Sequence, residues 1–404
     1  MAELLTNTTD LTKVASAIRE KGGTSDPLVY PDGFVTAIQA IQTGTELQII
    51  VTVASGATVT ATKGSKVVSG TAINGTCTLV VPEAGTWSVK ATLNGQTSDT
   101  KSVTFTDRYT TSLTFFSATI TVTVDSGASV VLKKNGTTLQ TKTSTGTVVF
   151  TVTETGTYTV EATKSGHAPA SGTVNVVSST TSYTLTLILP KDNFADNDWS
   201  AIIAACHSGS VPSTWVVGNS KTMTINGASY QVDIIGKNHD TYTAGGKAPL
   251  TFQLHDCYAD TKAMNSSDTN SGVWTSCAMR STHLPAILSL MPTEVQNGIR
   301  EVNKPTSAGS QSSTINTTAD KLFLLSEVEI FGSTTYSAAG EGTQYDYYKA
   351  GNSKVKKRNG SAADWWERSL IADVSAGFCL VSSYGNAYNG IASAAAGVAF
   401  GFCF

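Results

Sequence analysis

The feature that most constrains the fold is an internal repeat with a fixed offset. The segment GATVTATKG at 56–64 matches GASVVLKKNG at 127–136, and AGTWSVKAT at 84–92 matches TGTYTVEAT at 155–163. Both pairs of segments are 71 positions apart. A constant offset indicates that one structural unit of this length occurs twice.

Within each unit, short runs of alternating apolar and polar residues are separated by Gly, Asn-Gly or Ser-Gly turns. Trp87 and Tyr158 hold equivalent positions, and each begins an aromatic-Val-Ala alternation that predicts an inward strand face. Charged residues make up only 14% of the chain. Threonine, serine and glycine take their place, and β-branched threonine suits half-exposed strands. We therefore expect two small antiparallel β-sandwiches, over residues 45–108 and 109–190.

Residues 1–44 form the clearly helical start of the chain. Thr9 or Asp10 could cap a helix that ends at the Gly-Gly pair 22–23. A second helix is expected after YPDGF. Two helices of this size cannot bury a full core, so we expect the module to pack on a partner or on another copy. The apolar positions of the two helices are Leu11, Val14, Ala15 and Ile18, and Phe34, Ile38 and Ile41.

The composition changes at residue 191, after which tryptophan, histidine and cysteine become frequent. Residues 191–404 are numerous enough for a separate core and combine helical and strand patterns, which predicts an α+β domain. DWSAIIAACHSG and THLPAILSLMPTEVQNGIREV are expected to be helical, with Ile287, Leu290 and Met291 on an apolar side and Pro285 in a first turn. KLFLLSEVEIFG, residues 321–332, is expected to be a buried strand with its neighbours.

Motifs for phosphate binding, zinc proteolysis or a nucleophile elbow are absent from the sequence. The most enzyme-like pairs are His239-Asp240 and His255-Asp256, but adjacent residues on a strand point to opposite faces. We interpret these side chains as partners of loop backbone. NSSDTNSG at 265–272 has enough oxygen ligands for a calcium loop but lacks the glutamate that should follow, which favours a polar turn.

The six cysteines form no CxxC pair, so we expect no zinc site and interpret them as small buried residues in a reduced compartment. Cys379 and Cys403 could form a redox or nucleophilic pair, but apolar surroundings would raise the pKa of both thiols. No catalytic residue, metal or cofactor is therefore predicted.

Net charge is −3, and the one basic cluster, residues 354–358, predicts a solvated hairpin and no nucleic-acid partner. The N-terminus has no signal-peptide pattern, and the apolar run 391–404 is too short to cross a bilayer. We therefore expect synthesis in a cytoplasm and no membrane insertion.

DWWERS at 364–369 combines two tryptophans with Glu367 and Arg368. It suits a strand in which one indole enters the core, the other covers its rim, and the acid and guanidinium fix a loop. From residue 374 to the end no side chain is charged, although serine, asparagine and tyrosine interrupt the apolar residues.

Several segments, in this order, resemble a family of C-type-lectin-like domains common in gut bacteria and their phages. They are IIGKNHDTYTAGGKAPLTFQLHDCY, GVWTSCAMR, DKLFLLSEVEIFG, DWWERS and the terminal GVAFGFCF. The family is similar to the variable proteins of diversity-generating retroelements, and formylglycine-generating enzymes are relatives. The resemblance covers roughly residues 191–404, and the last strand departs from the usual GVRPAF at residues 399–401.

The two repeat units resemble bacterial immunoglobulin-like domains, which act as spacers in phage tail proteins and adhesins. The N-terminal module resembles modules that begin phage tail and baseplate-associated proteins. Together, these resemblances imply an attachment module, a stalk of sandwiches and a distal binding domain.

The C-type-lectin resemblance implies that the last strands run through the core and that short segments between them are displayed, where the family concentrates diversity by adenine-directed mutation. The candidate inward residues are Phe378, Val381, Val398, Phe400, Phe402 and Phe404. The candidate displayed, ligand-binding residues are Leu370, Ile371, Ala372, Asp373, Ser375, Ala376, Leu380, Ser382, Ser383, Tyr384, Asn386, Ala387, Tyr388, Asn389 and Ile391.

The composition of the displayed set is typical of adaptable recognition surfaces, because tyrosine provides contact area at low entropic cost. Lack of charge also avoids burying an unpaired ion at an interface. A simpler alternative is that YGNAYNG, residues 384–390, forms only a hairpin turn. A turn at the tip of a binding surface would satisfy both interpretations.

We predict a phage tail-associated receptor-binding protein, located in the virion tail, whose last domain binds a glycan or protein receptor on a host cell. The N-terminal module would bind other tail proteins, and a homo-oligomer, a trimer by analogy with the family, would gain avidity. One alternative is a bacterial surface or secreted adhesin, against which the missing signal peptide argues. Another is an enzyme of the formylglycine-generating type acting through Cys379 or Cys403.

Overall fold

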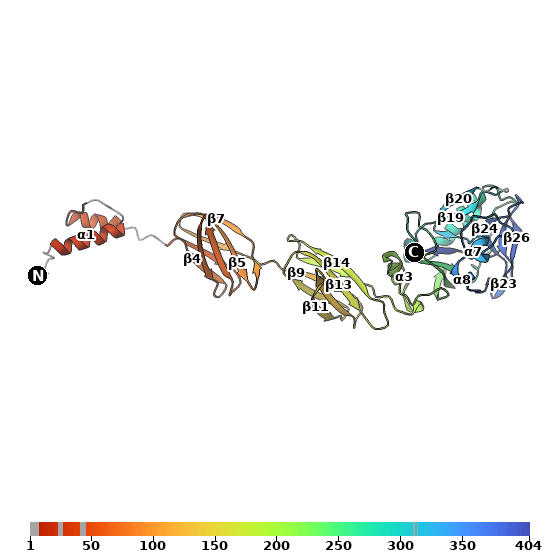
Figure 1. Cartoon of the computed structure of the whole chain (residues 1–404), viewed down its shortest axis with the longest axis horizontal. Coiled ribbons are helices and arrows are strands. Elements are labelled where there is room, and N and C mark those ends of the chain that lie inside the picture. Colours follow the sequence, from red (N-terminus) through yellow and green to blue (C-terminus); the bar gives the residue numbers. More distant parts are fainter. Residues whose placement is uncertain (1–7, 23–26, 41–45, 310–311, 313) are drawn as a thin grey trace. The chain divides into compact units, whose positions relative to one another are not determined.

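The computed structural model describes residues 8–22, 27–40, 46–309, 312 and 314–404. Two short helices come first, then two sets of β-strands, then a region that mixes helices and strands (Figure 1). The predicted class, a mostly β multidomain protein with a helical start and a C-terminal α+β region, is confirmed. The chain divides into two compact units, and all of residues 183–404 belong to the second.

The N-terminal helices are α1, Thr8–Gly22, and α2, Asp32–Ala40. Their shared core consists of Ala15, Ile18 and Phe34. The expected apolar faces are only partly buried, since Val14 and Ile38 are exposed. Two short helices cover only one side of each other, so the remaining apolar residues stay in solvent. Thr9 lies inside α1 rather than capping it, and Ile41 lies outside the described residues.

The first sandwich has two sheets, and Trp87 is fully buried on β5. The strand order of one sheet is β3-β2-β5-β6, with β7 also on β5, and the order of the other is β4-β1-β8. The pairing of β1 with β8 is parallel, so the expectation of a purely antiparallel sandwich was wrong for this edge. The strands are β1 Gln48–Thr52, β2 Thr58–Lys63, β3 Lys66–Thr71, β4 Thr76–Val80, β5 Gly85–Leu93, β6 Gln96–Thr97, β7 Lys101–Phe105 and β8 Arg108–Ser112.

The second sandwich repeats this arrangement, with sheets β11-β10-β13-β14 and β12-β9-β15. Tyr158 on β13 is buried at the position equivalent to Trp87, which confirms the alignment of the repeat. The strands are β9 Ala118–Thr123, β10 Ser129–Lys134, β11 Thr137–Thr143, β12 Thr147–Val152, β13 Gly156–Thr163, β14 Ala170–Val176 and β15 Ser182–Thr186.

The C-terminal region is built on a five-stranded sheet in the order β16-β17-β18-β27-β21. Its final strand, β27, lies between two others, and Phe402 pairs with Phe252 on β18. All six predicted inward residues are fully buried, which confirms that the chain end runs through the core. The strands are β16 Ser220–Ile225, β17 Ala228–Lys237, β18 Leu250–Leu254, β21 Leu322–Phe323 and β27 Gly401–Cys403.

A second sheet, in the order β24-β25-β26, carries the candidate site. Two separate hairpins, β19-β20 and β22-β23, complete the strands. The strands are β19 Val302–Ser307, β20 Ile315–Asp320, β22 Lys356–Arg358, β23 Ser361–Ala363, β24 Trp365–Leu370, β25 Gly377–Val381 and β26 Ala387–Ile391.

The helices of this region are short. Gly209, in the left-handed conformation at φ 69°, ends α3. None of the described helices is long and apolar enough to span a membrane. The helices are α3 Trp199–Ser208, α4 Val273–Ser276, α5 Leu284–Leu288, α6 Thr293–Gly298, α7 Glu327–Phe331 and α8 Asp346–Lys349, with a 3-10 turn at Phe194–Asp196 and a π turn at Met279–His283.

Three local expectations need correction. KLFLLSEVEIFG forms a strand only at β21 and then turns into α7, because Ser326 and Glu329 form a reciprocal capping box. Leu290 is exposed although Ile287 and Met291 are buried. The basic cluster does form a hairpin, but Lys356 within it is buried, and its Nζ donates to the carbonyl of His255 at 2.8 Å.

Candidate ligand-binding surface

The candidate site is the display surface, which we define as the exposed parts of residues 371–376 and 382–391. It comprises the edge strand β26, the turn that precedes it and the segment that follows β24. Tyr384 is 86% exposed and Tyr388 is 53% exposed. Thirteen of the fifteen predicted display residues are at least partly exposed, and only Leu370 and Leu380 are buried. Whether this surface binds a ligand stays a prediction.

Leu370 and Leu380 are corrections to the predicted set, at 1% and 5% exposure. Leu380 pairs across the sheet with Trp366 on one side and Tyr388 on the other. Leu370 pairs with Phe378. Because side chains of paired residues share a sheet face, Leu380 lies on the face of Trp366 and Leu370 on the face of Phe378, and both of these partners are fully buried.

The turn between β25 and β26 is a tight hairpin. Ser382 N–H donates to the Asn386 carbonyl at 2.9 Å, and Gly385, at φ 81°, donates to the Ser382 carbonyl at 2.8 Å. Asp364 anchors the turn by accepting from Ser383 N–H at 2.6 Å. The hairpin alternative is thus confirmed for residues 382–386, and the turn leaves Tyr384 outside.

A polar loop, residues 265–272, holds the display surface from behind. The Asn270 side-chain amide donates to the carbonyls of Val374 and Gly377 at 2.8 and 3.1 Å. Asp268 accepts from Ser393 N–H at 3.3 Å, and Asn265 N–H donates to Ala392 at 3.0 Å. The segment that was considered as a calcium loop is therefore a polar turn. It holds the backbone at residues 374–377 and at residues 392–393, which follow β26. Sequence reasoning did not find this role, although the density of asparagine and aspartate marked the loop.

Two hollows lie beside β26. The Tyr336 hollow, of about 330 Å³, is lined by Tyr336, Ile371, Asp373, Val374, Asn389 and Ile391, among others. The Trp366 hollow, of about 390 Å³, is lined by Trp366, Leu380, Tyr388, Asp364, Arg358 and Ala396, among others. Residues 389–391 line both hollows, so the two adjoin the same strand.

Both tryptophans of DWWERS are fully buried, so the expectation that one covers the rim was wrong. The indole N–H of Trp365 donates to the Lys354 carbonyl at 3.0 Å, and that of Trp366 donates to Lys262 at 2.8 Å. The returning chain pairs with β24 here, since Trp366 N–H also donates to the Gly397 carbonyl at 3.0 Å.

Arg368 on the same strand belongs to what we call the buried ionic cluster, which also contains Glu329, Lys304 and Asp240. Arg368 contacts Glu329 through two nitrogens, one at 2.9 Å, and Lys304 Nζ reaches Glu329 at 2.7 Å and Asp240 at 2.9 Å. Burial alone would raise the pKa of Asp240, but Lys304 and Thr251 outweigh burial and lower the pKa to about 2. Two carboxylates and two cations thus balance one another in the core.

Glu367, the neighbour of Arg368, is fully buried without any hydrogen-bond partner in the described structure. Burial, and the nearby carboxylates of Glu327 and Glu341, raise the pKa of Glu367 well above its ordinary value. The expectation that this acid fixes a loop is therefore wrong. Burial without a partner therefore favours the neutral form of the Glu367 carboxyl group.

The two His-Asp pairs do not form dyads. His239 stacks on Tyr345 with ring centroids 4.0 Å apart, while Asp240 belongs to the buried ionic cluster rather than to a loop. His255 Nδ1 lies 2.6 Å from Asp233, whose hydrogen bond raises the pKa of His255. Asp256 accepts from Lys357 N–H at 2.7 Å, so the backbone interpretation is confirmed for this residue.

All six cysteines lie in the described part of the chain, and each is buried and unbridged, which confirms their interpretation as small core residues. Cys379 and Cys403 are fully buried, and burial raises the pKa of both thiols well above the ordinary value. The sulfur of Cys379 lies 3.6 Å from the Leu370 carbonyl, and that of Cys403 lies 3.5 Å from Thr251 Oγ1. Neither thiol is poised as a nucleophile.

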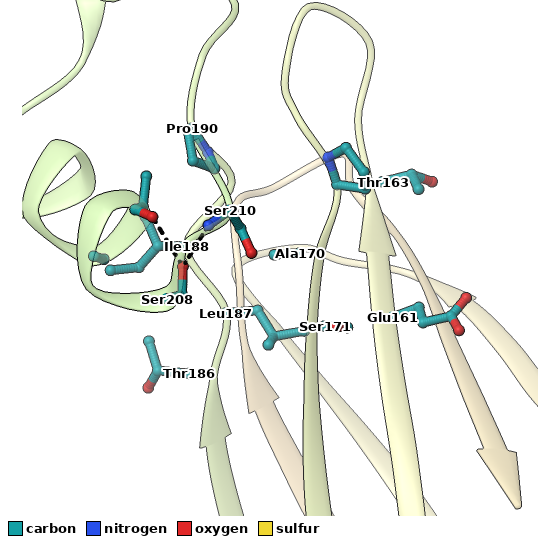
Figure 2. A pocket seen from close by; sticks show the side chains of 13 residues that line it. Glu161, Thr163, Ala170, Ser171, Thr186, Leu187, Ile188, Pro190, Ser208 and Ser210 are labelled. Carbon is teal, nitrogen blue, oxygen red and sulfur yellow. Dashed lines mark hydrogen bonds between the residues drawn. The ribbon is translucent and has the colours of Figure 1, made fainter. Parts of the chain in front are cut away.

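Another hollow, of about 510 Å³, is shown in Figure 2. Its lining includes Glu161, Ala170 and Ser171 from the second sandwich and Ser208 from the end of α3. Ser208 Oγ donates to Ala205 at 3.1 Å and accepts from Ser210 N–H at 3.4 Å. Glu161 is the one titratable side chain in the lining, and Lys133 already pairs with it at 2.7 Å. This hollow therefore offers no acid–base pair.

Across the described ranges, histidine, cysteine, aspartate and glutamate side chains form no group of three or more that could hold a metal ion.

Residues 250–403 match a family described as a domain of unknown function, DUF6273. No curated protein matches the chain. A solved minor pilin of Streptococcus agalactiae is 12% identical, with 36% of this chain and 96% of that chain covered and a TM-score of 0.24. The major pilin subunit of Bacillus cereus is 16% identical, with 36% and 57% covered and a TM-score of 0.17. The major pilin T-13 of Streptococcus pyogenes is 10% identical, with 37% and 97% covered and a TM-score of 0.18. Such low TM-scores carry no argument, so the sandwich assignment depends on the sheets themselves.

Proposed function

We propose that this chain is an attachment protein whose C-terminal domain binds a host-cell receptor through the display surface. The observation that carries the proposal is an exposed pair of tyrosines, Tyr384 and Tyr388, on a hairpin without charged side chains. Exposed tyrosine among serine, asparagine and glycine is typical of recognition surfaces. The Asn270 amide holds the backbone at Val374 and Gly377, so we expect substitutions at exposed positions of this surface to leave the fold intact.

The resemblance of the sequence to C-type-lectin-like variable proteins supports a finer proposal. The protein would be associated with a phage tail, and the display surface would be diversified by a retroelement. The encoding DNA should then lie beside a reverse-transcriptase gene and a near-copy of the final segment, with differences at template adenines. If sequencing of the locus finds neither, the protein is an undiversified adhesin of a phage or a bacterial surface.

The N-terminal module supports attachment to other tail proteins or to further copies of the chain. Val14 and Ile38 remain exposed on helices in which three of the described side chains are buried. Covering such side chains is favourable by roughly 25 cal/mol per Å² of apolar surface. An oligomer, a trimer by analogy with the resembled family, would add avidity.

The enzymatic alternative has less support. A formylglycine-generating type of reaction would use Cys379 or Cys403, and both thiols are buried with raised pKa values. Cys379→Ser and Cys403→Ser variants should keep receptor binding under the attachment proposal. Loss of thiol oxidation or of turnover in these variants would favour the enzyme instead.

The direct test is binding of the fluorescently labelled full chain to intact cells of a panel of gut-bacterial strains. We expect binding to at least one strain and a loss of roughly tenfold or more in the Tyr384→Ala, Tyr388→Ala double variant, since central aromatic residues dominate interfaces. Tyr109→Ala, in the first sandwich, is the matched control and should bind normally. Absence of binding to every strain, or equal binding by the double variant, would contradict the proposal.

A further inference from the structure

The strand β26 has a free edge whose hydrogen-bonding groups can be located from the ladder around it. Ser382 N–H donates to Asn386 at one end of the ladder, and Ala392 N–H donates to Ala376 at the other. In an antiparallel ladder, hydrogen-bonded pairs alternate with non-bonded pairs, so Leu380 pairs with Tyr388 through hydrogen bonds. The N–H and C=O of Ala387 and Asn389 therefore point away from β25.

These outward groups are not covered by another element of the described chain. The sheet order ends at β26, and no backbone hydrogen bond beyond that ladder reaches Ala387 or Asn389 in the described ranges. Proteins usually protect such an edge with lysine, proline or a bulge. The strand Ala387–Ile391 reads AYNGI and pairs with β25 without a register shift, so it has none of these protections.

The two hollows lie on opposite faces of this strand. Gly390 faces Trp366 and Leu380, because a Cβ added there would lie 2.9 and 3.1 Å from them. Asn389 and Ile391 point to the other face, with Gly377, whose added Cβ would lie 2.8 Å from Ile371. The Trp366 hollow is therefore on one face and the Tyr336 hollow on the other.

We propose that β26 binds its partner by strand addition, and that the partner is an extended segment of a protein receptor. Main-chain groups of Ala387 and Asn389 would pair with the segment, and its alternate side chains would enter the Tyr336 and Trp366 hollows. The volumes, about 330 and 390 Å³, are at the low end of those of ligand pockets. The strand β26 itself carries no charge, whereas Asp373 lines the Tyr336 hollow and Asp364 and Arg358 line the Trp366 hollow. This inference rests on the proposed function, since it names the class of receptor.

The test uses substitutions that separate backbone from side chain. Asn389→Pro removes the outward N–H and leaves the inner ladder intact, as proline is tolerated on edge strands at positions facing solvent. Asn389→Ala, the matched control, removes the same side chain and keeps the N–H. The full chain is panned against a displayed library of random linear peptides and, in parallel, incubated with a glycan array. Tryptophan fluorescence on unfolding shows whether each variant is folded.

We expect enriched peptides whose binding to Asn389→Pro is about tenfold or more weaker than their binding to Asn389→Ala, which lacks the same side chain but keeps the N–H. If Asn389→Pro does not fold, the same peptides are N-methylated at single positions. N-methylation at alternate positions along the peptide should then weaken its binding to the unmodified protein.

Three results would overturn strand addition. The first is that no peptide is enriched, with or without glycan binding. The second is that peptides bind equally well to Asn389→Pro and after N-methylation. The third is that the free chain sediments as a dimer and that Asn389→Pro abolishes this dimer. Cell binding that survives Asn389→Pro but fails in the Tyr384, Tyr388 double variant would overturn strand addition alone. Cell binding that survives both would overturn the proposed function as well.

Discussion

The sheet β24-β25-β26 carries Arg368 of the buried ionic cluster at one edge and the strand of the display surface at the other, and the side chains at the two edges are held in opposite ways. Arg368 on β24 is fully buried and contacts Glu329 through two nitrogens, whereas Tyr388 on β26 is more than half exposed. One strand, β25, separates them. This difference indicates that ion pairs between side chains stabilise the β24 edge of the sheet, whereas backbone hydrogen bonds mainly hold the β26 edge.

The largest effect is expected at the cluster. Arg368→Leu leaves Glu329 buried without its bidentate partner, and the free energy of unfolding should fall by about 3–5 kcal/mol. Denaturant unfolding followed by tryptophan fluorescence measures this change. As a control, Asp260→Asn removes an exposed ion pair to Lys262 and should cost about 0–1 kcal/mol. Equal losses in the two variants would contradict the distinction between core and surface charges.

Glu367→Leu should have the next largest effect, and it should stabilise. The change replaces an unpartnered buried carboxyl with an apolar group, for a gain of about 1–4 kcal/mol. Glu327→Leu is the matched control and should destabilise, because Glu327 accepts from Tyr336 N–H and from Ser337. If Glu367→Leu also destabilises, Glu367 has a partner that the described contacts do not include.

Comparison of Glu367→Leu with the unmodified chain also gives a pH dependence of stability. The pKa of Glu367 is raised in the folded state, so above the ordinary pKa of glutamate the unfolded chain releases a proton that the folded chain keeps. Stability that depends on Glu367 is therefore fully present below that ordinary pKa and decreases as the pH rises towards the folded-state pKa. The gain from Glu367→Leu should grow over the same range in unfolding measured at several pH values. A gain that shrinks with rising pH would be inconsistent with a neutral Glu367.

Asn270→Ala should have an intermediate effect that connects the two regions. It leaves the carbonyls of Val374 and Gly377 without this donor, for a loss of about 1–3 kcal/mol. Hydrogen exchange should also become faster at residues 374–377. Ser271→Ala, in the same loop but exposed, is the control and should change little. Unchanged hydrogen exchange in Asn270→Ala would show that residues 374–377 keep their conformation without the hydrogen bonds from Asn270.

The smallest effect on stability is expected where the effect on binding is largest. Tyr384→Ala and Tyr388→Ala should change the free energy of unfolding by no more than about 0.5 kcal/mol each, as exposed positions usually do. A thermal-unfolding comparison with the unmodified chain is sufficient. A loss above about 2 kcal/mol would place these tyrosines in the scaffold and remove the contrast between the two regions.

The site was only partly predictable. The resemblance of the chain end to C-type-lectin-like domains predicted both the buried phenylalanines and most of the exposed residues around the hairpin. The clamp by Asn270 joins residues more than one hundred positions apart, and no local pattern reports such a contact. In contrast, SEVE at 326–329 is a capping-box pattern that could have identified α7 and excluded a strand there.

The repeat in the sequence was enough to predict the two sandwiches, and the resemblance to C-type-lectin-like domains predicted the inward phenylalanines near the chain end. Both signals can be read from the sequence without knowledge of how distant segments pack. Only the tertiary structure decided that Leu370, Leu380 and both tryptophans of DWWERS are buried, and that Glu367 lacks a partner. Burial and pairing depend on which distant segments cover a residue, and that is settled only when the whole core packs.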